Sequence, residues 1–399
     1  MWIRVRLDIG WGDLLRGLLG SLFARDAAAA AESLEAHWAK DGDGLACLSV
    51  RSALDLLFTS LDLPEGSEVL YSAVTIPDMV QVAREHGLVP VPVDLAGSDL
   101  HVDLEALRRA ITPQSRVLVV AHLFGALPDL TEVLGVAKGA GIFVVEDCAQ
   151  AWCGPTYRGD LRADASLMSF GAIKTATTLG GSLARVADPA ILARMREIQG
   201  TQPKESRRAY AGRVLESGLQ LIMSMLPVFS TMVWFAHRRG KTVDELIDGL
   251  TARFPGDGLM QQLRQQPCAA QLRLLEHRLR TYDMGRIEQR VANAKSLLDS
   301  AGFSKGCPEL SDPRHTFWLF PYPSDDPQAL VKELWTKGVD SARYGSLKIV
   351  PAPEGRGELD CVSARDLLDH IVFLPCYPEL PPRALDRLRE ALAGASTRN

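Results

Sequence analysis

Two side chains near the middle of the chain have types that could act together in catalysis. Asp147 ends an apolar run, and Lys174 stands between a serine-bearing segment and the pair Gly180 and Gly181. A lysine amine forms an imine with an aldehyde, and an acid at the end of a strand can hold a ring nitrogen protonated. The pair therefore suits pyridoxal phosphate, whose ring the acid turns into an electron sink. The alternative is that Asp147 caps a turn and Lys174 is an ordinary surface lysine.

The segments around this pair alternate between strand and helix. Helical periodicity covers 78–86, 103–110 and 127–140, and short β-branched runs predict strands at 68–75, 89–95, 116–125, 141–150, 165–174 and 181–188. Several runs are too uniformly apolar for a strand with one wet face, so we expect an α/β fold whose mostly parallel central sheet is flanked by helices. Ligands of such sheets bind beyond the carboxyl ends of the strands. Four polar residues fall there: Thr75, His122, Asp147 and Lys174.

The composition is that of a chain with a large core. It has 399 residues, 47% hydrophobic content and a net charge of −5, which predicts two domains. No long basic or acidic block occurs, so we expect no nucleic-acid partner. The seven cysteines are odd in number and scattered, and charges interrupt the N-terminal apolar run too early for a secretory signal. We therefore expect a cytoplasmic protein with reduced thiols.

Several segments, taken in order, resemble one known family. They are 48–54 (LSVRSAL), Asp94, 121–125 (AHLFG), 146–150 (EDCAQ), Gly154 with Tyr157 and Gly159, Ser169 and Phe170 before Lys174, and 374–378 (LPCYP). Their order and spacing resemble the DegT/DnrJ/EryC1/StrS aminotransferases, a branch of the fold type I pyridoxal phosphate enzymes. The resemblance implies a large cofactor-binding domain at 1–265 and a smaller C-terminal α+β domain at 266–399.

The resemblance assigns the chemistry to the residue pair described above. It implies that Lys174 carries the cofactor as an imine and then, as a neutral amine, moves the proton between substrate and cofactor. Asp147 would pair with the pyridine nitrogen, Gln150 would lie beside the phenolic oxygen of the cofactor, and Ser169 would bind its phosphate. No metal is expected.

Three departures from the family pattern affect the cofactor contacts. The glycine and threonine of the family's phosphate turn are replaced by a valine and Arg51. We expect the phosphate to meet the amides of Arg51 and Ser52 at a helix start, together with the Arg51 charge. Ile76 stands where the family often stacks an aromatic ring on the cofactor. Arg264 is the candidate replacement for an asparagine that reaches the phosphate in the neighbouring subunit.

The activity implied by the resemblance is amino transfer by a homodimer whose active site lies at the subunit interface. The amino donor would be glutamate or glutamine, and the acceptor a ketone or aldehyde such as a nucleotide-linked keto sugar. Three alternatives stay open. They are another pyridoxal phosphate reaction such as dehydration, a non-catalytic protein that keeps the fold for binding or regulation, and a membrane-associated interaction protein.

An insertion at about 205–260 distinguishes the chain from the family. Residues 218–235 carry no charge, but Pro227 divides them, so two short apolar helices are expected rather than one membrane span. Arginine-rich flanks would suit a hairpin over 205–240 that rests on anionic lipid, and packing against the partner subunit is the alternative. Residues 9–23 allow the same two interpretations. A lipid-facing surface would favour a more hydrophobic or lipid-linked ketone as acceptor.

Overall fold

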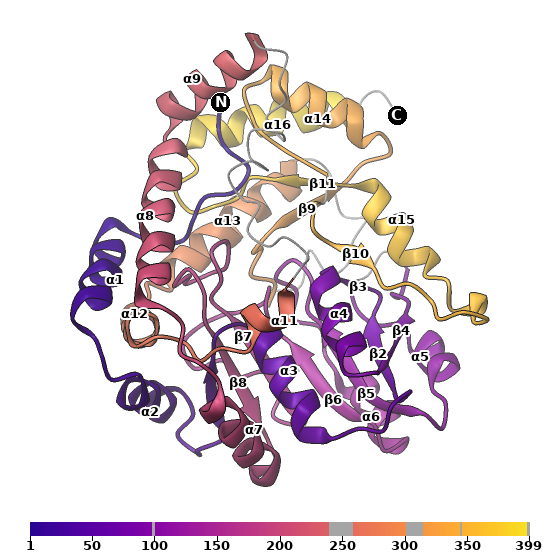
Figure 1. Ribbon diagram of the computed structural model, residues 1–399. Helices are drawn as coiled ribbons and strands as arrows, with labels where there is room; N and C mark the ends of the chain where they lie inside the picture. The colour runs from indigo at the N-terminus through magenta and orange to yellow at the C-terminus, as the bar shows by residue number, and fades with distance from the viewer. Residues whose placement is uncertain (98–99, 239–257, 301–313, 344, 397–399) are drawn as a thin grey trace.

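The described part of the chain is built around a seven-stranded sheet (Figure 1). This computed structural model describes residues 1–97, 100–238, 258–300, 314–343 and 345–396. The strands are β1 Gly44–Cys47, β2 Glu68–Ser72, β4 Val89–Val93, β5 Ser115–Ala121, β6 Phe143–Asp147, β7 Ala165–Ser169 and β8 Ser182–Val186. Their order is β1-β8-β7-β6-β5-β2-β4, with parallel pairing from β7 to β4 and β8 antiparallel to both its neighbours. The predicted mostly parallel sheet is confirmed.

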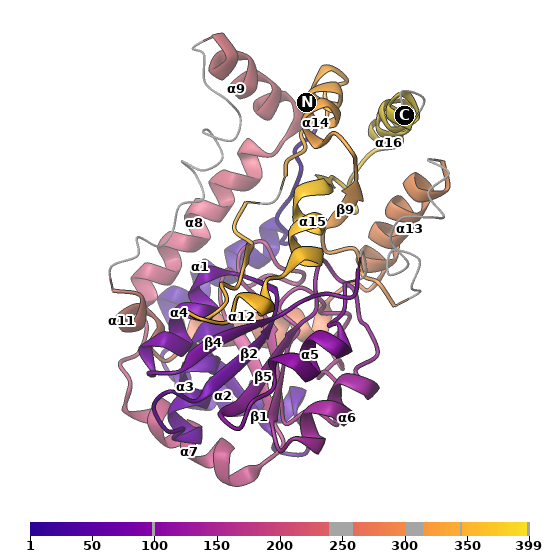
Figure 2. The ribbon, with the colours of Figure 1, turned by 90° about the vertical axis from the view of Figure 1, so that its right-hand side faces the viewer.

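Helices cover both faces of this sheet. The large unit contains α1 Trp11–Phe23, α2 Ala27–Trp38, α3 Val50–Leu61, α4 Pro77–Glu85, α5 Leu104–Ala110, α6 Thr131–Gly139, α7 Pro189–Thr201, α11 Leu259–Leu263 and α12 Ala269–Thr281. Figure 2 shows α3, α4 and α7 on one side of the sheet and α5 and α6 on the other. Val145 of β6 packs in the core cluster of the first group, whereas Val144 packs with the second. Successive strand side chains point to opposite faces. Asp147 therefore belongs to the α3 face and Glu146 to the α6 face.

The strands end earlier than the sequence predicts at the edge that carries the polar residues. β7 ends at Ser169, so Lys174 lies in a turn beyond the strand, where its N–H donates to the Gly171 carbonyl at 3.0 Å. β6 ends at Asp147 rather than Gln150, because the chain leaves the sheet there and bonds within a turn. The predicted strand at 68–75 divides into β2 and the short β3 Val74–Thr75, which pairs with β10 Lys348–Ile349.

A second, smaller unit packs beside the sheet edge that carries Lys174 (Figure 1). Its elements are α13 Gly285–Ser300, β9 Phe320–Pro323, α14 Pro327–Thr336, the 3-10 turn Gly357–Leu359, α15 Val362–His370, β11 Ile371–Leu374 and α16 Pro382–Ser396. The leucine- and arginine-rich sequence at 268–298 predicts one long helical stretch, but the structure interrupts it at 282–284, between α12 and α13.

The boundary expected at residues 265–266 stays a prediction, but the packing around it differs from a simple division there. α12 follows that point and packs in one core cluster with α2 of the large unit. The first residues of the chain pack with the small unit instead, since Trp2 joins its core and Arg4 forms a bidentate pair with Asp340. A cut at 265–266 would therefore separate helices that share a core.

The apolar insertion forms two helices, α8 Arg207–Met223 and α9 Leu226–Arg238. This confirms the two short helices predicted from Pro227, which lies in the first turn of α9, where a proline is tolerated. Within the described residues, no single helix has the length and apolarity to cross a bilayer. α8 together with 226–235 meets that criterion only as a pair bent by 84°. The remainder of the insertion, 239–257, lies outside the described residues.

Candidate active site

The loop that carries Lys174 is held by a dense set of hydrogen bonds. Thr177 Oγ1 donates to the Gly171 carbonyl at 2.6 Å and accepts from the Leu179 N–H at 2.9 Å. The N–H of Ala176 donates to Asp8 Oδ2, which ties the loop to the N-terminal segment. Ala176 and Leu179 have φ values of 54° and 64°, a left-handed conformation that such bonds must maintain. The backbone therefore fixes where the lysine side chain begins.

Lys174 lies in surroundings that favour its neutral form. The residue is half-buried, which favours the neutral amine, whereas the Trp318 ring, whose centroid is 3.9 Å from Nζ, favours the ammonium through a cation–π contact. Burial lowers the pKa of Lys174 to about 8, and the Arg51 charge adds to this effect, whereas Asp147 opposes it. A lysine with this pKa carries a usable fraction of free amine near neutral pH, as a nucleophile towards an aldehyde must.

We expect the reaction of Lys174 with an aldehyde to show this low pKa directly. The rate of pyridoxal phosphate attachment to cofactor-free protein should rise with pH and level off with a midpoint near 8, because only the neutral amine attacks. At pH 7 the rate should exceed that of an unperturbed lysine by about a hundredfold. This attachment rate is measured by trapping the imine with borohydride at pH values between 6 and 10 and quantifying the modified peptide by mass spectrometry.

The Asp147→Asn variant provides the matched check of that assignment. Asp147 raises the pKa of Lys174, so its neutralisation should move the midpoint below that of the wild type. A midpoint near 10 in the wild-type protein would show that Lys174 behaves as a solvated lysine.

Asp147 is buried at the end of β6, and one of its two carboxylate oxygens accepts no hydrogen bond from the described residues. Its Oδ1 accepts from the Ala149 N–H at 2.9 Å, and among the described residues Oδ2 accepts no hydrogen bond. Burial raises the pKa of Asp147, and the Ala149 N–H, Lys174 and His122 each oppose that rise. A buried carboxylate of this kind is stabilised as an anion by a protonated ring nitrogen, so the residue fits the pyridine nitrogen of pyridoxal phosphate.

The start of α3 lies on the same face of the sheet as Asp147. Ser49 caps the helix, accepting from the Ser52 N–H at 3.1 Å, and its hydroxyl also lies 3.0 Å from the Ser52 hydroxyl. Arg51 is close enough to lower the pKa of Lys174, but its guanidinium is ion-paired with Asp78 at the start of α4. The amides of a helix start attract a phosphate. The Arg51 charge would be shared between such a phosphate and Asp78.

The other residues predicted to contact the cofactor, Gln150, Ser169 and Ile76, each make contacts within the chain. Gln150 Oε1 accepts from the Phe124 N–H at 2.9 Å and so holds the loop after β5, where Phe124 has a φ of 58°. Ser169 Oγ accepts weakly from the Gly171 N–H at 3.4 Å. Ile76 precedes α4 and is half-buried against the cores on both sides of it. The assignment of these three residues to the cofactor stays a prediction.

Arg264 is engaged within its own chain. Its guanidinium bonds to both oxygens of Asp55 on α3, from Nη2 at 3.0 Å and from Nε at 3.1 Å, and His86 bonds to the same carboxylate at 2.8 Å. Asp55 lies one helical turn beyond Arg51, so Arg264 is anchored to the helix that begins at the proposed phosphate site. Its contact with a neighbouring subunit's phosphate stays a prediction.

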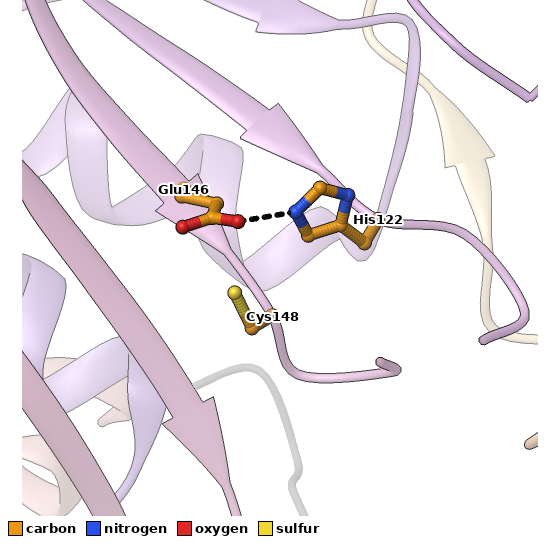
Figure 3. Close-up of side chains that lie close together, drawn as sticks. All are labelled: His122, Glu146 and Cys148. Atoms are coloured by element: carbon orange, nitrogen blue, oxygen red, sulfur yellow. Dashed lines mark hydrogen bonds and ion pairs between the residues drawn. The ribbon is translucent and has the colours of Figure 1, made fainter. Parts of the chain in front are cut away.

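A buried cluster on the opposite face of the sheet combines His122, Glu146 and Cys148 (Figure 3). His122 Nε2 lies 2.6 Å from Glu146 Oε1, and Glu146 Oε2 accepts from Ser166 at 2.9 Å and from the Asp160 N–H at 2.7 Å. Burial raises the pKa of Glu146, but these bonds outweigh it and hold the pKa below its usual value. Burial also raises the pKa of Cys148 well above normal, which keeps the thiol protonated. The hydrogen bonds of this cluster therefore connect the end of β5 to β6.

Two cavities flank the strand ends. The larger, of about 790 Å³, is lined by His122, Glu146 and Tyr157 and lies on the α6 face, away from Asp147. The smaller, of about 40 Å³, is lined by Lys174 together with residues of the small unit. The cavity with the reactive amine is therefore the tighter of the two.

Sequence reasoning missed the residues that complete the surroundings of Lys174. Trp318 and Arg290 come from the small unit, and Asp8 comes from the N-terminal segment. The sequence predicts a strand at 316–322 that includes Trp318, although β9 begins only at Phe320. No periodicity or spacing connects Trp318 with a lysine so distant in the chain. Arg290 lies within a helix rich in arginine, where nothing in the pattern separates a buried one from the others.

Comparison with known proteins shows which family the chain resembles in sequence. The sequence profile of the DegT/DnrJ/EryC1/StrS aminotransferase family matches residues 27–226. GDP-perosamine synthase of Caulobacter vibrioides is 30% identical over 167 residues, which cover 41% of this chain and 45% of that protein. L-glutamine:2-deoxy-scyllo-inosose aminotransferase of Streptomyces kanamyceticus is 32% identical over 156 residues, covering 37% of this chain and 35% of that protein. The chain thus matches less than half the length of these curated relatives.

Solved structures resemble the fold over nearly the whole chain. NtdA of Bacillus subtilis, whose crystal structure has the bound cofactor PMP, aligns with a TM-score of 0.70 at 18% identity and covers 97% of this chain and 82% of that one. At this identity the likeness concerns the fold. It extends the match beyond residue 226 into the small unit.

Proposed function

Because the chain belongs to the DegT/DnrJ/EryC1/StrS aminotransferase family, we propose that it is a pyridoxal phosphate-dependent aminotransferase. It would move an amino group from an amino acid to a ketone or aldehyde. Bound pyridoxal phosphate supplies an electron-withdrawing ring that stabilises negative charge on the substrate carbon. The remaining steps depend on side chains of this chain.

The observation that carries the proposal is the electrostatic pairing of Lys174 and Asp147 at one sheet edge. Each shifts the pKa of the other, so the amine and the carboxylate share one environment. The start of α3, with Ser49 as its cap, lies on the same face. An amine, an acid and a helix start are the three groups that a pyridoxal phosphate site requires.

The roles of these groups follow from their chemistry. Lys174, neutral in part near pH 8, provides the nitrogen that holds the cofactor and then the base that moves a proton at the substrate carbon. Asp147 holds a proton on the ring nitrogen through its spare oxygen, and the amides that begin α3 bind the phosphate. Trp318 lies over the Lys174 amine and shields it from water.

The substrates and the assembly form the finer part of the proposal. We favour glutamate or glutamine as donor, and one relative carries L-glutamine in its name. Relatives named for GDP-perosamine and for 2-deoxy-scyllo-inosose support a nucleotide-linked keto sugar or a cyclitol ketone as acceptor. We also propose a homodimer in which Arg264, now paired with Asp55, lies near the subunit interface.

A spectroscopic assay tests the proposed function. The purified protein should be yellow and should lose that colour when glutamate or glutamine is added, as the cofactor takes up the amino group. Sugar-nucleotide ketones, cyclitol ketones and apolar ketones, added in turn, should restore it. A stable colour with every amino acid would favour a non-catalytic binding protein, and loss of water from a substrate would favour a dehydratase.

A further inference from the structure

Arg290 of α13 is a buried cation that lacks a neutralising partner in the described chain. The residue is 5% exposed, and its hydrogen bond there runs from Nη1 to Thr175 Oγ1 at 3.0 Å. Its Nε is buried and has no acceptor among the residues that the structure describes. Removing a charge from water is costly unless the charge is paired, so buried arginines normally contact a carboxylate. A guanidinium without a carboxylate among the described residues indicates an anion that those residues do not supply.

Arg290 lines the same small cavity as Lys174. Three other arginines line it, of which Arg4 and Arg286 are paired with acidic side chains. Arg6, like Arg290, forms no ion pair with a described carboxylate. Because Arg286 is paired with two acids, Asp8 and Glu379, the four arginines and their described carboxylate partners leave a surplus of one positive charge beside Lys174. Its volume of about 40 Å³ suits a single oxyanion group rather than a nucleotide.

We propose that Arg290, assisted by Arg6, binds an oxyanion of the substrate next to Lys174. This inference rests on the proposed function, because it places a substrate group next to the amine that would hold the cofactor. The planar guanidinium binds a carboxylate or a phosphate through two parallel hydrogen bonds. The expected source is the carboxylate of the amino donor, and the phosphate of a sugar-linked acceptor is the other. The two half-reactions distinguish these sources.

Anion-dependent stability of the holoenzyme tests the site without turnover. Succinate and inorganic phosphate, added separately, report on the two sources, and at least one should raise the thermal unfolding midpoint of the wild type. Arg290→Met should lose that response, and Arg290→Lys should keep part of it. The control is Arg365→Met. Arg365 is an exposed arginine of α15 that pairs with Asp360, and this variant should respond like the wild type. An unchanged response in Arg290→Met would overturn the proposal.

Half-reaction kinetics identify the source. If the donor carboxylate is bound, Arg290→Met should raise the KM for glutamate by about 10- to 100-fold, with a smaller change in the limiting rate. An increase confined to the acceptor half-reaction would assign the site to phosphate. An equal fall in both limiting rates with unchanged KM values would overturn the binding role. A wild type that shows the anion response but no half-reaction would refute the proposed function alone.

An independent observation concerns the exposed apolar side chains of α1, α8 and α9, here called the apolar face. Twelve of the fifteen exposed large apolar side chains in the described chain lie on these helices or on the α8–α9 link. Leu15, Leu219 and Trp234 are 58%, 55% and 49% exposed. α1 and α8 lie side by side, with Gly17 close to Val214, and α9 continues from α8 (Figure 1). Exposed apolar side chains concentrated on neighbouring helices in this way mark a contact with another body.

The charges around the apolar face favour an anionic membrane surface over a second copy of the chain. The exposed charged side chains described on these helices are Arg16, Arg208, Arg238 and the single acid Glu216. Arg238 also stacks on Trp234, with its guanidinium carbon 3.9 Å from the ring centroid. If a second copy of the chain packed on this face, the arginines of the two copies would approach and repel each other. Anionic lipid headgroups would instead attract these arginines. We infer that the apolar face rests on anionic lipid.

Contact with lipid would also affect the active site. Tyr210 of α8 donates to the carbonyl of Thr178, in the loop that follows Lys174. A helix that rests on a membrane would therefore hold the catalytic loop near lipid. On such a surface a lipid-linked ketone joins the nucleotide-linked and cyclitol ketones as a candidate acceptor.

Vesicle sedimentation with a matched pair of variants tests the membrane contact. The protein should bind vesicles of phosphatidylglycerol and phosphatidylcholine, and bind less to phosphatidylcholine alone or in 0.5 M salt, which screens charge. Leu219→Glu should reduce binding at least about tenfold. Leu161→Glu, at a leucine 64% exposed elsewhere, should not. The inference is wrong if anionic vesicles bind neither the wild type nor the variants, and Leu219→Glu, but not Leu161→Glu, converts a dimer to a monomer. The apolar face would then be an interface between copies of the chain.

Discussion

Replacement of Lys174 by alanine should abolish covalent retention of pyridoxal phosphate and slow amino transfer from the donor by at least about 10³-fold. The variant removes the amine that the structure places beside Asp147, and with it both the cofactor attachment and the proton-moving base. Lys174→Arg should be as inactive, because a guanidinium stays protonated and cannot form the linkage. Borohydride reduction followed by peptide mass spectrometry, together with stopped-flow absorbance, measures both effects.

Lys138→Ala is the matched control for this substitution. Lys138 is exposed on α6 and paired with Asp164 at 3.3 Å, so its loss should leave the colour and the transfer rate unchanged. A reducible adduct that persists in Lys174→Ala, or a transfer rate within tenfold of the wild type, would show that another group does this chemistry.

Asp147→Asn should keep the cofactor but lower the rate of the donor half-reaction by about 10²- to 10³-fold. An amide cannot hold a proton on the ring nitrogen, so the ring would stabilise carbanionic charge poorly. The substitution conserves shape, and the Asn oxygen can still accept from the Ala149 N–H, so the thermal midpoint should change little. Single-turnover absorbance with glutamate, compared at saturating concentrations, isolates this step from donor binding.

Glu146→Gln separates the role of Asp147 from general effects at the end of β6. The two acids are adjacent but face opposite sides of the sheet. Glu146 binds His122, Ser166 and a backbone N–H, so its neutralisation should cost about 1–3 kcal/mol of stability while the half-reaction rate changes little. Equal slowing in the two variants would contradict a specific role for Asp147.

Local sequence patterns were sufficient to predict the sheet and the sheet edge at which Asp147 and Lys174 lie. Uniformly apolar strands imply a sheet covered on both faces, and parallel strands bring their carboxyl ends to one edge. Asp147 and Lys174 could be placed at that edge for this reason, although Lys174 lies in a turn beyond β7 rather than in the strand. The two short helices of the insertion followed from Pro227 alone.

The partners of these residues could not be predicted in the same way. Arg51 was expected to serve the phosphate directly, yet it pairs with Asp78 on α4. Arg264 was expected to reach the phosphate in a neighbouring subunit, and within its own chain it pairs with Asp55 on α3. A charged side chain has several potential partners at similar energy, and the choice depends on which helices pack together.

The amino-acid sequence by itself determined the family, the parallel sheet and the identity of the amine and carboxylate at its edge, because these depend on residue type and short-range period. Only the tertiary structure decided what surrounds the amine. Trp318 and Arg290 reach Lys174 through the docking of the small unit, and Asp8 through the path of the N-terminal segment. The lowered pKa of Lys174 is a result of that enclosure, since burial is a property of the packed chain and not of any short stretch of it.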